Sequence, residues 1–351
     1  MATTIVDVAK KAGVGEATVV RALRGSGYVS PATKARVIKA ARELNYRPNH
    51  LARSLALGTS QFIGLIAGSD IVSAFHPYLG TLEQGIRNAG YSLLFCIATS
   101  DSQDAERSCL EEMISKRTGG VIVSPGTLSS SAEPYREALD SGVHLVIVDK
   151  LVDGLAAPQI IVDQYKSGRI ATEHLISLGH RDIIYLAIPA TSNVGRERAR
   201  GFREAMEDAG IPVTDSSIVE VDRTEEAGMK AAAQLLKTDR LPTGIVTRHD
   251  VVAIGLMQTI LDAGLSIPGD VSIVSHGDHG PMYALRVPLT TVHTPTEQMI
   301  DVALKMILDM VSGIPVKPEV TLLDVHLVVR ASTGPPRWSL GFGECVAISH
   351  D

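Results

Sequence analysis

Histidine and aspartate side chains occur together at two places in the second half of the chain. One is His249-Asp250, and the other is the stretch 276–279, which reads HGDH. Imidazole and carboxylate groups can ligate a metal or act as general acid and base. A His-x-x-His pair on a glycine-rich loop without further nearby ligands is weak evidence for zinc. We therefore expect the rim of a binding pocket at 276–279, with no metal.

The motifs of the common enzyme classes do not stand out. The sequence has no GxSxG elbow, phosphate-binding loop, HExxH or paired nucleophile and base. The histidines and acids could in principle hydrolyse a bound sugar, and product analysis after incubation with candidate ligands would detect this. We expect no turnover and no cofactor.

Charge is distributed unequally along the chain. The whole sequence carries 33 Lys and Arg against 39 Asp and Glu, a formal net charge of -6. Residues 1–60 contain ten of the basic and three of the acidic residues, so a head of +7 precedes a body of -13. Basic groups gain affinity for phosphate backbones through counterion release, and the acidic body repels DNA. The sequence predicts nucleic-acid contact confined to the N-terminal end.

Three short helices are predicted within the basic head. Thr4 can cap the first, with Asp7 as its capping-box partner, and Gly13 ends it. The second covers 16–24, and the third begins at a serine and proline and covers 30–45. Two helices joined by a glycine-containing turn form a helix-turn-helix.

Short apolar runs alternate with helical patterns beyond the head, as in parallel sheets of α/β domains. The expected strands are 62–67, 92–98, 120–124, 144–148, 183–188, 217–221, 244–247 and 271–275. The expected helices are 79–89, 105–115, 165–178, 194–209, 225–236, 250–263 and 297–311. This pattern fits two doubly wound lobes, with a ligand cleft at the carboxyl ends of their strands.

The cysteines and apolar segments indicate the compartment. Cys96, Cys109 and Cys345 contain no CxxC pair, and their odd number fits neither a disulfide framework nor a structural zinc site. No secretory signal opens the chain, and no stretch approaches the roughly 18 apolar residues of a membrane span. We expect a cytoplasmic protein without a membrane partner.

Several spaced motifs resemble the lactose-repressor (LacI/GalR) family of transcriptional regulators. They are TIVDVA at 4–9, ATV at 17–19, GYVS at 27–30, LNYRPN at 44–49, GHR at 179–181 and PLTT at 288–291. The similarity covers roughly residues 3–334. It implies an all-α helix-turn-helix DNA-binding head and an α/β two-lobed periplasmic-binding-protein-like sensor with two doubly wound parallel sheets.

The resemblance also implies a division of the chain. The helix-turn-helix domain would cover 1–48, followed by a hinge helix and linker at 49–60. The N-terminal sensor subdomain would combine 61–160 with 294–321, and the C-terminal one 161–293 with 322–334. Three crossing strands would join the lobes. The tail 335–351 shows no leucine heptads, so we expect no tetramerising coiled coil.

In this family the second helix of the head enters the major groove of DNA. Arg21 would pair with guanine and Glu16 would accept from cytosine, although each could instead be a surface charge. Gly15 and Val20 stand where the family usually has serines, so two hydroxyl contacts to phosphate are lost. The other DNA contacts expected in the head are Thr4, Gly15, Ala17, Thr18 and Tyr28.

The hinge carries a second set of expected DNA contacts. Leu55 matches the leucine that wedges into the minor groove at the centre of the operator, although it could instead pack on its dimer mate or on the sensor. Asn49, Ala52 and Arg53 would contact DNA beside it. The family implies a homodimer on a palindromic double-stranded operator, and we expect the helices at 79–89 and 225–236 to form the dimer contacts.

The sensor is expected to hold a small effector in its cleft. Arg198 matches the family arginine that anchors the ligand, Phe75 matches a pocket-lining aromatic residue, and Asp149 follows the fourth strand. His249 stands where members often have asparagine, although a surface histidine is an equal alternative. The remaining expected contacts are Lys150, Arg223 and Asp278.

The basic residues of this set favour an anionic ligand. Arg198, Arg223 and Lys150 around one cleft would suit a sugar acid or sugar phosphate besides a neutral sugar. The usual ligand-binding aspartate falls on Gly277, so either Asp278 substitutes for it or the ligand lacks the corresponding hydroxyl. Effector binding would change lobe closure and thereby the spacing of the hinge helices. A periplasmic binding protein would share this sensor but would lack the basic head.

Overall fold

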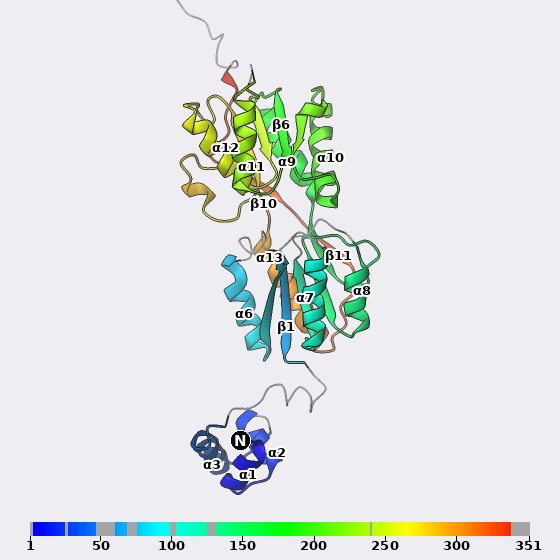
Figure 1. Cartoon of the computed structure of the whole chain (residues 1–351), viewed down its shortest axis with the longest axis vertical. Coiled ribbons are helices and arrows are strands. Elements are labelled where there is room, and N and C mark those ends of the chain that lie inside the picture. The colour runs from blue at the N-terminus through cyan, green and yellow to red at the C-terminus, as the bar shows by residue number, and fades with distance from the viewer. Residues whose placement is uncertain are drawn as a thin grey trace, which may run out of the picture. The chain divides into compact units, whose positions relative to one another are not determined.

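The computed structural model describes residues 3–24, 27–46, 60–68, 76–98, 103–124, 131–238 and 241–337. The chain forms two compact units, Met1–Gln61 and Phe62–Asp351 (Figure 1). Several sequence predictions lie outside the described residues: Asn49, Ala52, Arg53, Leu55 and Phe75, with most of the hinge helix and the tail beyond Arg337. Among the helices that are described, none has the length and apolar character needed to cross a membrane.

The first unit is a small helical head. Its helices are α1 (Ile5–Ala12), α2 (Glu16–Arg24) and α3 (Pro31–Glu43). Val8, Val19 and Val37, one from each helix, are fully buried at its centre. Burial of apolar surface from all three helices stabilises elements that are too short to persist alone.

The ends of the head helices confirm the predicted capping residues. The Thr4 side chain accepts a hydrogen bond from the backbone of Asp7, whose carboxylate in turn accepts from the Thr4 backbone. Gly13 ends α1 in the left-handed region, with φ 64°. Ser30 caps α3, and a proline occupies the first turn. These local signals place α2 between two well-defined helices.

The second unit contains two six-stranded sheets. The first sheet has the order β11-β5-β4-β3-β1-β2, and its paired strands are parallel. Its strands are β1 (Phe62–Gly68), β2 (Ser92–Ala98), β3 (Gly120–Ser124), β4 (His144–Val148), β5 (Gln159–Val162) and β11 (Val320–Leu323). The almost completely buried strands β1, β3 and β4 are the continuous apolar runs expected for a sheet covered on both faces.

The second sheet has the order β12-β10-β9-β8-β6-β7. Its strands are β6 (Ile183–Ala187), β7 (Ile218–Glu220), β8 (Gly244–Thr247), β9 (Ser272–Gly277), β10 (Thr290–His293) and β12 (His326–Val328). All pairs are parallel except β12 with β10, which are antiparallel. We call the two halves the first lobe and the second lobe, after the sheet that each contains.

Helices cover both sheets (Figure 1). They are α6 (Leu79–Asn88), α7 (Gln103–Ser115), α8 (Glu133–Asp140), α9 (Gln164–Ser177), α10 (Asn193–Asp208), α11 (Glu225–Leu235), α12 (Asp250–Asp262) and α13 (Thr296–Val311), with short 3-10 turns η1 (His76–Tyr78), η2 (Asp215–Ser217) and η3 (Met282–Ala284). Helix α13 follows β10 of the second sheet but packs on β3 and β4 of the first. The chain therefore passes repeatedly between the lobes.

Helices α9 and α10 cross with their backbones in contact. A Cβ atom on Gly168 would collide with the carbonyl of Arg198, and one on Gly201 would collide with the carbonyl of Tyr165. Only glycine fits at both positions, because every other residue would bring a Cβ into the opposing backbone. The segment that carries Arg198 is therefore held firmly against α9.

The cysteine interpretation was wrong in one respect. The structure joins Cys96 of β2 to Cys109 of α7 in a disulfide, with a Cα–Cα distance of 6.0 Å. The odd cysteine count argued against a framework that uses every cysteine, but it did not exclude a single pair. The fold brings a strand and the following helix together, which sequence spacing did not reveal.

Candidate functional site

The exposed face of α2 carries the residues predicted to read DNA bases. Gly15, Glu16, Ala17 and Arg21 are not packed in the core, and Thr18 is half-buried. The Nε atom of Arg21 donates to the carbonyl of Ala17 at 3.2 Å, so in this structure the side chain lies along its own helix. The charged ends of Glu16 and Arg21 are nevertheless accessible to a groove. The side chains on this face of α2 are therefore not needed for the core of the head and remain accessible to DNA.

Two further predicted DNA contacts, Tyr28 and Thr4, lie outside α2. Tyr28 precedes α3 and is 88% exposed, which is unusual for an aromatic side chain without a partner surface. The hydroxyl of Thr4 donates to the carboxylate of Asp7 at 2.8 Å as part of the helix cap. Thr4 therefore has a structural role that does not depend on DNA.

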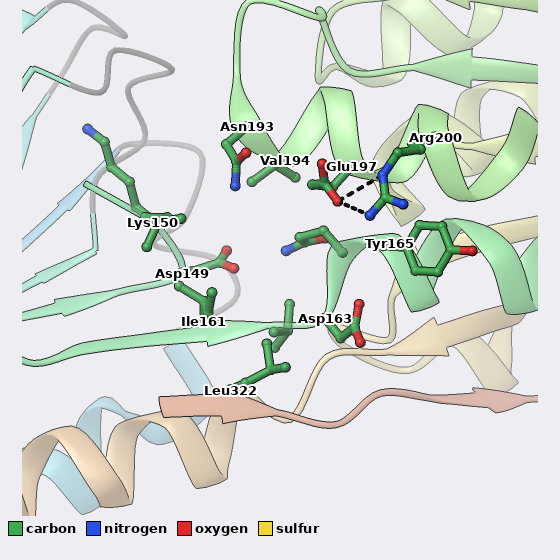
Figure 2. Close-up of a pocket in the computed structure, with 13 residues that line it drawn as sticks. Asp149, Lys150, Ile161, Asp163, Tyr165, Asn193, Val194, Glu197, Arg200 and Leu322 are labelled. Atoms are coloured by element: carbon green, nitrogen blue, oxygen red, sulfur yellow. Dashed lines mark hydrogen bonds and ion pairs between the residues drawn. The ribbon is translucent and has the colours of Figure 1, made fainter. Parts of the chain in front are cut away.

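A pocket of about 420 Å³ is lined by residues from both lobes (Figure 2). Its walls comprise Asp149, Lys150, Leu151, Ile161, Val162, Asp163, Gln164, Tyr165, Asn193, Val194, Glu197, Arg200 and Leu322. The first lobe contributes the end of β4 with β5 and β11, and the second lobe contributes the first turns of α9 and α10. Asp149 follows β4 with φ 60°, a conformation that costs energy for a residue other than glycine.

Lys150 lines this pocket, but its charged end is held by its own lobe. Its Nζ atom lies 3.7 Å from a carboxylate oxygen of Glu106 and donates to the Tyr135 hydroxyl at 3.1 Å. The two charged side chains are only 11% and 3% exposed. Burial lowers the pKa of Lys150 and raises that of Glu106, whereas their mutual attraction opposes both shifts. Figure 2 shows the Lys150 side chain directed away from Asn193 and Glu197.

Arg198 lies just behind the pocket wall. Its Nε donates to the side-chain oxygen of Gln164 at 2.6 Å, and its Nη1 donates to the backbone carbonyl of Arg248 at 2.9 Å. The side chain is 8% exposed. Burial lowers its pKa, and the nearby Tyr185 and Asp149 partly counteract this. Arg198 is thus connected through Gln164 to the pocket that Asp149 also lines.

Arg223 and His249 form the second predicted group at the ends of the second sheet. A guanidinium nitrogen of Arg223 lies 2.7 Å from Nε2 of His249. Because arginine can only donate, Nε2 accepts from Arg223, while Nδ1 lies 3.4 Å from the backbone nitrogen of Val251 at the start of α12. Burial and the Arg223 charge hold the pKa of His249 well below its usual value. His249 also begins α12 and stacks on His279, with ring centroids 5.6 Å apart.

Arg248 was not predicted from the sequence. It is 9% exposed and donates to the carbonyl of Val221. Its Nε atom is buried without a hydrogen-bond partner among the described residues. Burial, followed by the charge of Arg223, lowers its pKa to about 10. Its position after a strand, beside the predicted His249, is the sequence signal that could have identified it.

Asp278, directly after β9, contacts residues at the end of β10 and just beyond β12. Its carboxylate lies 2.8 Å from Arg330 and 3.3 Å from Nδ1 of His293. Burial alone would raise the pKa of Asp278, but the hydrogen bonds from His293 and Arg330 lower it. Gly277 has φ 133°, and a Cβ there would lie 2.8 Å from the Asp250 carboxylate. An aspartate at 277 would therefore be crowded and strained.

Comparison with known proteins places these features in context. Residues 4–49 match the model for bacterial regulatory proteins of the lacI family, and residues 172–333 match the periplasmic binding protein-like domain. The chain is 34% identical over 336 residues to the HTH-type transcriptional repressor PurR of Proteus mirabilis (strain HI4320), covering 94% of this chain and 96% of the relative. The PurR repressor of Serratia proteamaculans (strain 568) is 33% identical over 336 residues, with the same coverage.

Solved structures agree with this match. The lac repressor dimer bound to operator and the anti-inducer ONPF superposes with a TM-score of 0.83 at 26% identity, covering 95% of this chain and all of that one. The transcriptional regulator CelR with cellobiose gives 0.68 at 25% identity, covering 94% and 99%. A helix-turn-helix head on a two-lobed ligand-binding domain defines a DNA-binding repressor, not an enzyme. The chain belongs to the lacI family of bacterial regulatory proteins, whose members act in the cytoplasm.

Proposed function

We propose that a dimer of this protein represses transcription by binding a palindromic operator, and that a small sugar, sugar acid or sugar phosphate between the lobes controls the binding. The observation that carries this proposal is the pairing of an exposed α2 face with a pocket lined by both lobes. The domain limits given by the sequence analysis, from the head at 1–48 to the tail at 335–351, remain part of the proposal.

The base contacts proposed for the head are Glu16, Ala17 and Arg21. Their exposure supports the assignment, because Val19 and Ala22 on the same helix face the core. The hydrogen bond from Arg21 to the Ala17 carbonyl would exchange for bonds to a guanine in the major groove. Supporting contacts are assigned to Thr4, Gly15, Thr18 and Tyr28, and the hinge contacts to Asn49, Ala52, Arg53 and Leu55.

The edge strands of the two sheets support the proposed dimer. Phe95 and Ile97 of β2 are 37% and 42% exposed, and Val219 of β7 is 39% exposed. Met229 on α11, the helix that follows β7, is 38% exposed. Exposed apolar side chains at the outer edge of a sheet mark a surface that association would cover. The surface includes the predicted helix α11 and lies beside α6, which packs on β2.

The effector contacts proposed in the second lobe are Arg198, Arg223 and His249, with Asp149 and Phe75 in the first. Lys150 and Asp278 receive weaker support, because each is already held by neighbours of opposite charge. Since both lobes line the pocket, a ligand there would bind a particular lobe separation best. Such differential affinity is what shifts a population between states.

Selection of bound sequences from a random double-stranded DNA pool tests the proposal. We expect a palindrome, and Arg21→Ala should weaken binding to it by roughly 10- to 100-fold, the effect of a bidentate base contact. Lys39→Ala, which removes an equal charge from the exposed face of α3, should change affinity far less. Leu55→Ala should weaken the palindrome more than random DNA. Equal loss with Arg21→Ala and Lys39→Ala, or no enriched palindrome, would contradict the proposal.

A further inference from the structure

The strand order of the second sheet identifies a specific place for a ligand. From β6 the chain continues to β7 on one side and then to β8 on the other, so the order reverses between β6 and β8. Ligands of open α/β sheets bind beyond the carboxyl ends of strands at such reversals. Arg223 follows β7, Arg248 follows β8, and Arg198 lies on α10, the helix that follows β6. Guanidinium groups are thus concentrated at this point.

Two of these three groups are deeply buried, and among the described residues the nearest carboxylates, Asp149 for Arg198 and Asp222 for Arg248, act on them only from beyond ion-pair distance. Arg198 and Arg248 are 8% and 9% exposed. Within the part of the chain that the structure describes, neither forms an ion pair, and their acceptors are neutral: the Gln164 side chain and the carbonyls of Arg248 and Val221. Buried charges in proteins are normally paired, because desolvation of an unpaired charge is costly. The cluster therefore has room for a counter-charge.

The neighbouring histidines do not add positive charge to this cluster. Burial, followed by the charge of Arg223, holds the pKa of His249 well below its usual value and lowers that of His279 to about 4. Both rings are neutral near pH 7. His249 accepts from Arg223 and so fixes the direction of that guanidinium before any ligand arrives. Preorganised donors bind an anion with less loss of side-chain entropy.

The arginine cluster suits an anion better than a neutral sugar, because few free acceptors for sugar hydroxyls lie beside it among the described residues. Gly277, the last residue of β9, offers no side-chain group to a ligand, and crowding by Asp250 disfavours any side chain there. The adjacent Asp278 is occupied by Arg330 and His293. Asp250 likewise already accepts from the Thr291 hydroxyl and from the backbone nitrogen of His279, so both of these carboxylates are engaged within the protein.

We propose that Arg198, Arg223 and Arg248 form an oxyanion subsite that binds the phosphate or carboxylate group of the effector. This inference rests on the proposed function, in which the effector occupies the interlobe cleft, and it adds Arg248 as the residue that sets preference for a charged ligand. Guanidinium groups bind such oxyanions through charge-assisted hydrogen bonds in a matching planar geometry. Arg248 contributes a buried Nε atom that has no hydrogen-bond partner among the described residues, while another of its nitrogens holds the Val221 carbonyl.

Calorimetry and thermal unfolding of the full-length chain test the subsite. The probes are inorganic phosphate, glucose 6-phosphate, gluconate and glucose, at constant ionic strength. We expect phosphate to bind and raise the unfolding temperature, and glucose to do neither. A stronger response to glucose 6-phosphate than to gluconate identifies a phosphate site, and the reverse identifies a carboxylate site. Arg223→Met and Arg248→Met should each raise the dissociation constant for phosphate at least about tenfold, as loss of a charge-assisted contact predicts.

Arg203→Met is the matched control, because Arg203 is exposed on the same helix as Arg198. It should leave phosphate binding unchanged. Arg248→Lys retains the charge without the planar group and should weaken phosphate less than Arg248→Met does, which guards against a folding defect. The subsite is refuted if none of the three anions binds, or if they bind equally to Arg248→Met and Arg203→Met. Operator binding measured on the same samples separates the two proposals: intact operator recognition without anion binding overturns only the subsite, and the reverse overturns only the repressor.

Discussion

Buried cations at the pocket side of the first lobe and at the strand ends of the second lobe are held in opposite ways. In the first lobe, Lys150 is balanced by Glu106 and Tyr135. In the second, Arg198 and Arg248 have only neutral acceptors among the described residues. A charge that is already paired supports the fold, whereas one without a counter-charge is available to a ligand. The difference teaches that basic residues around a cleft indicate a ligand only after the partners of each are known.

The helices of the two lobes also meet differently. In the first lobe, the half-buried Arg107 of α7 forms ion pairs with the exposed Glu133 and Glu137 of α8. In the second lobe, glycines bring the backbones of α9 and α10 into direct contact. The second lobe therefore presents its arginines from the more closely packed scaffold. The predictions below test this contrast.

Disrupting the glycine contact should have the largest effect. Gly201→Val places side-chain atoms against the carbonyl of Tyr165, so we expect the free energy of unfolding to fall by about 3 kcal/mol or more. Urea unfolding measures the loss. Gly80→Ala is the control: a Cβ atom at that position would point into open space, and the change should stay below about 1 kcal/mol. Similar losses in both variants would contradict the contrast.

Breaking the ion pair between Lys150 and Glu106 in the first lobe should have the second-largest effect on stability. Lys150→Met leaves Glu106 buried without its partner, and we expect a loss of about 3 kcal/mol in the free energy of unfolding. Phosphate binding should not change, because Lys150 belongs to the fold rather than to the subsite. The double variant Lys150→Met with Glu106→Gln removes both charges and should recover much of the loss. Weaker phosphate binding by Lys150→Met would assign that residue to the ligand.

Acid should destabilise the second lobe through its neutral histidines. The folded pKa of His279 is about 4, below the 6.5 of an unfolded histidine, so the unfolded state binds more protons as the pH falls through 6.5. This group should therefore cost about 2 kcal/mol of stability between pH 7 and pH 5. His279→Gln should lessen that acid loss, as measured by urea unfolding at both pH values.

Asp250 provides a matched test, because its titration should change the stability in acid in the opposite direction from that of His279. Burial raises its pKa to about 6, so the folded state takes up a proton between pH 7 and pH 5 and gains stability. Asp250→Asn should therefore increase the acid loss by about 1 kcal/mol. If both variants shift the pH dependence in the same direction, these pKa assignments are wrong.

The smallest effect on stability should come from the second lobe's arginine. Arg248→Met loses the hydrogen bond to Val221 but relieves burial of a charge beside Arg223. These terms oppose one another, so we expect a change below about 1 kcal/mol in the free energy of unfolding, together with the loss of phosphate affinity. A loss as large as that of Lys150→Met would remove the distinction between the lobes.

Local signals in the sequence predicted much of the fold. The capping box of Thr4 and Asp7 and the apolar runs of β1, β3 and β4 depend on neighbouring residues alone, and the structure confirms them. The short strands β5, β10, β11 and β12 and helix α8 were not predicted individually. Each of these four strands has only three or four residues, too few to display a period, and its pairing depends on distant parts of the chain.

The site was less accessible to sequence reasoning. Arg198 came from family resemblance, but its contact with Gln164 depends on the crossing of α9 and α10. Lys150 looked like a cleft cation because its partner Glu106 lies on α7, which only the fold brings near. Charge type is visible in a sequence, whereas the partner that neutralises it is a property of packing.

The two glycines at which α9 and α10 cross restrict the substitutions that this ligand-binding domain can accept during evolution. Replacement of Gly168 or Gly201 by a larger residue pushes the helices apart and carries Arg198 with them. Variation in the strand-end residues that follow β7 and β8, such as Arg223 and Arg248, leaves the crossing intact. Substitutions in those loops can therefore change the ligand preference, whereas the packing of α9 against α10 keeps Arg198 in place.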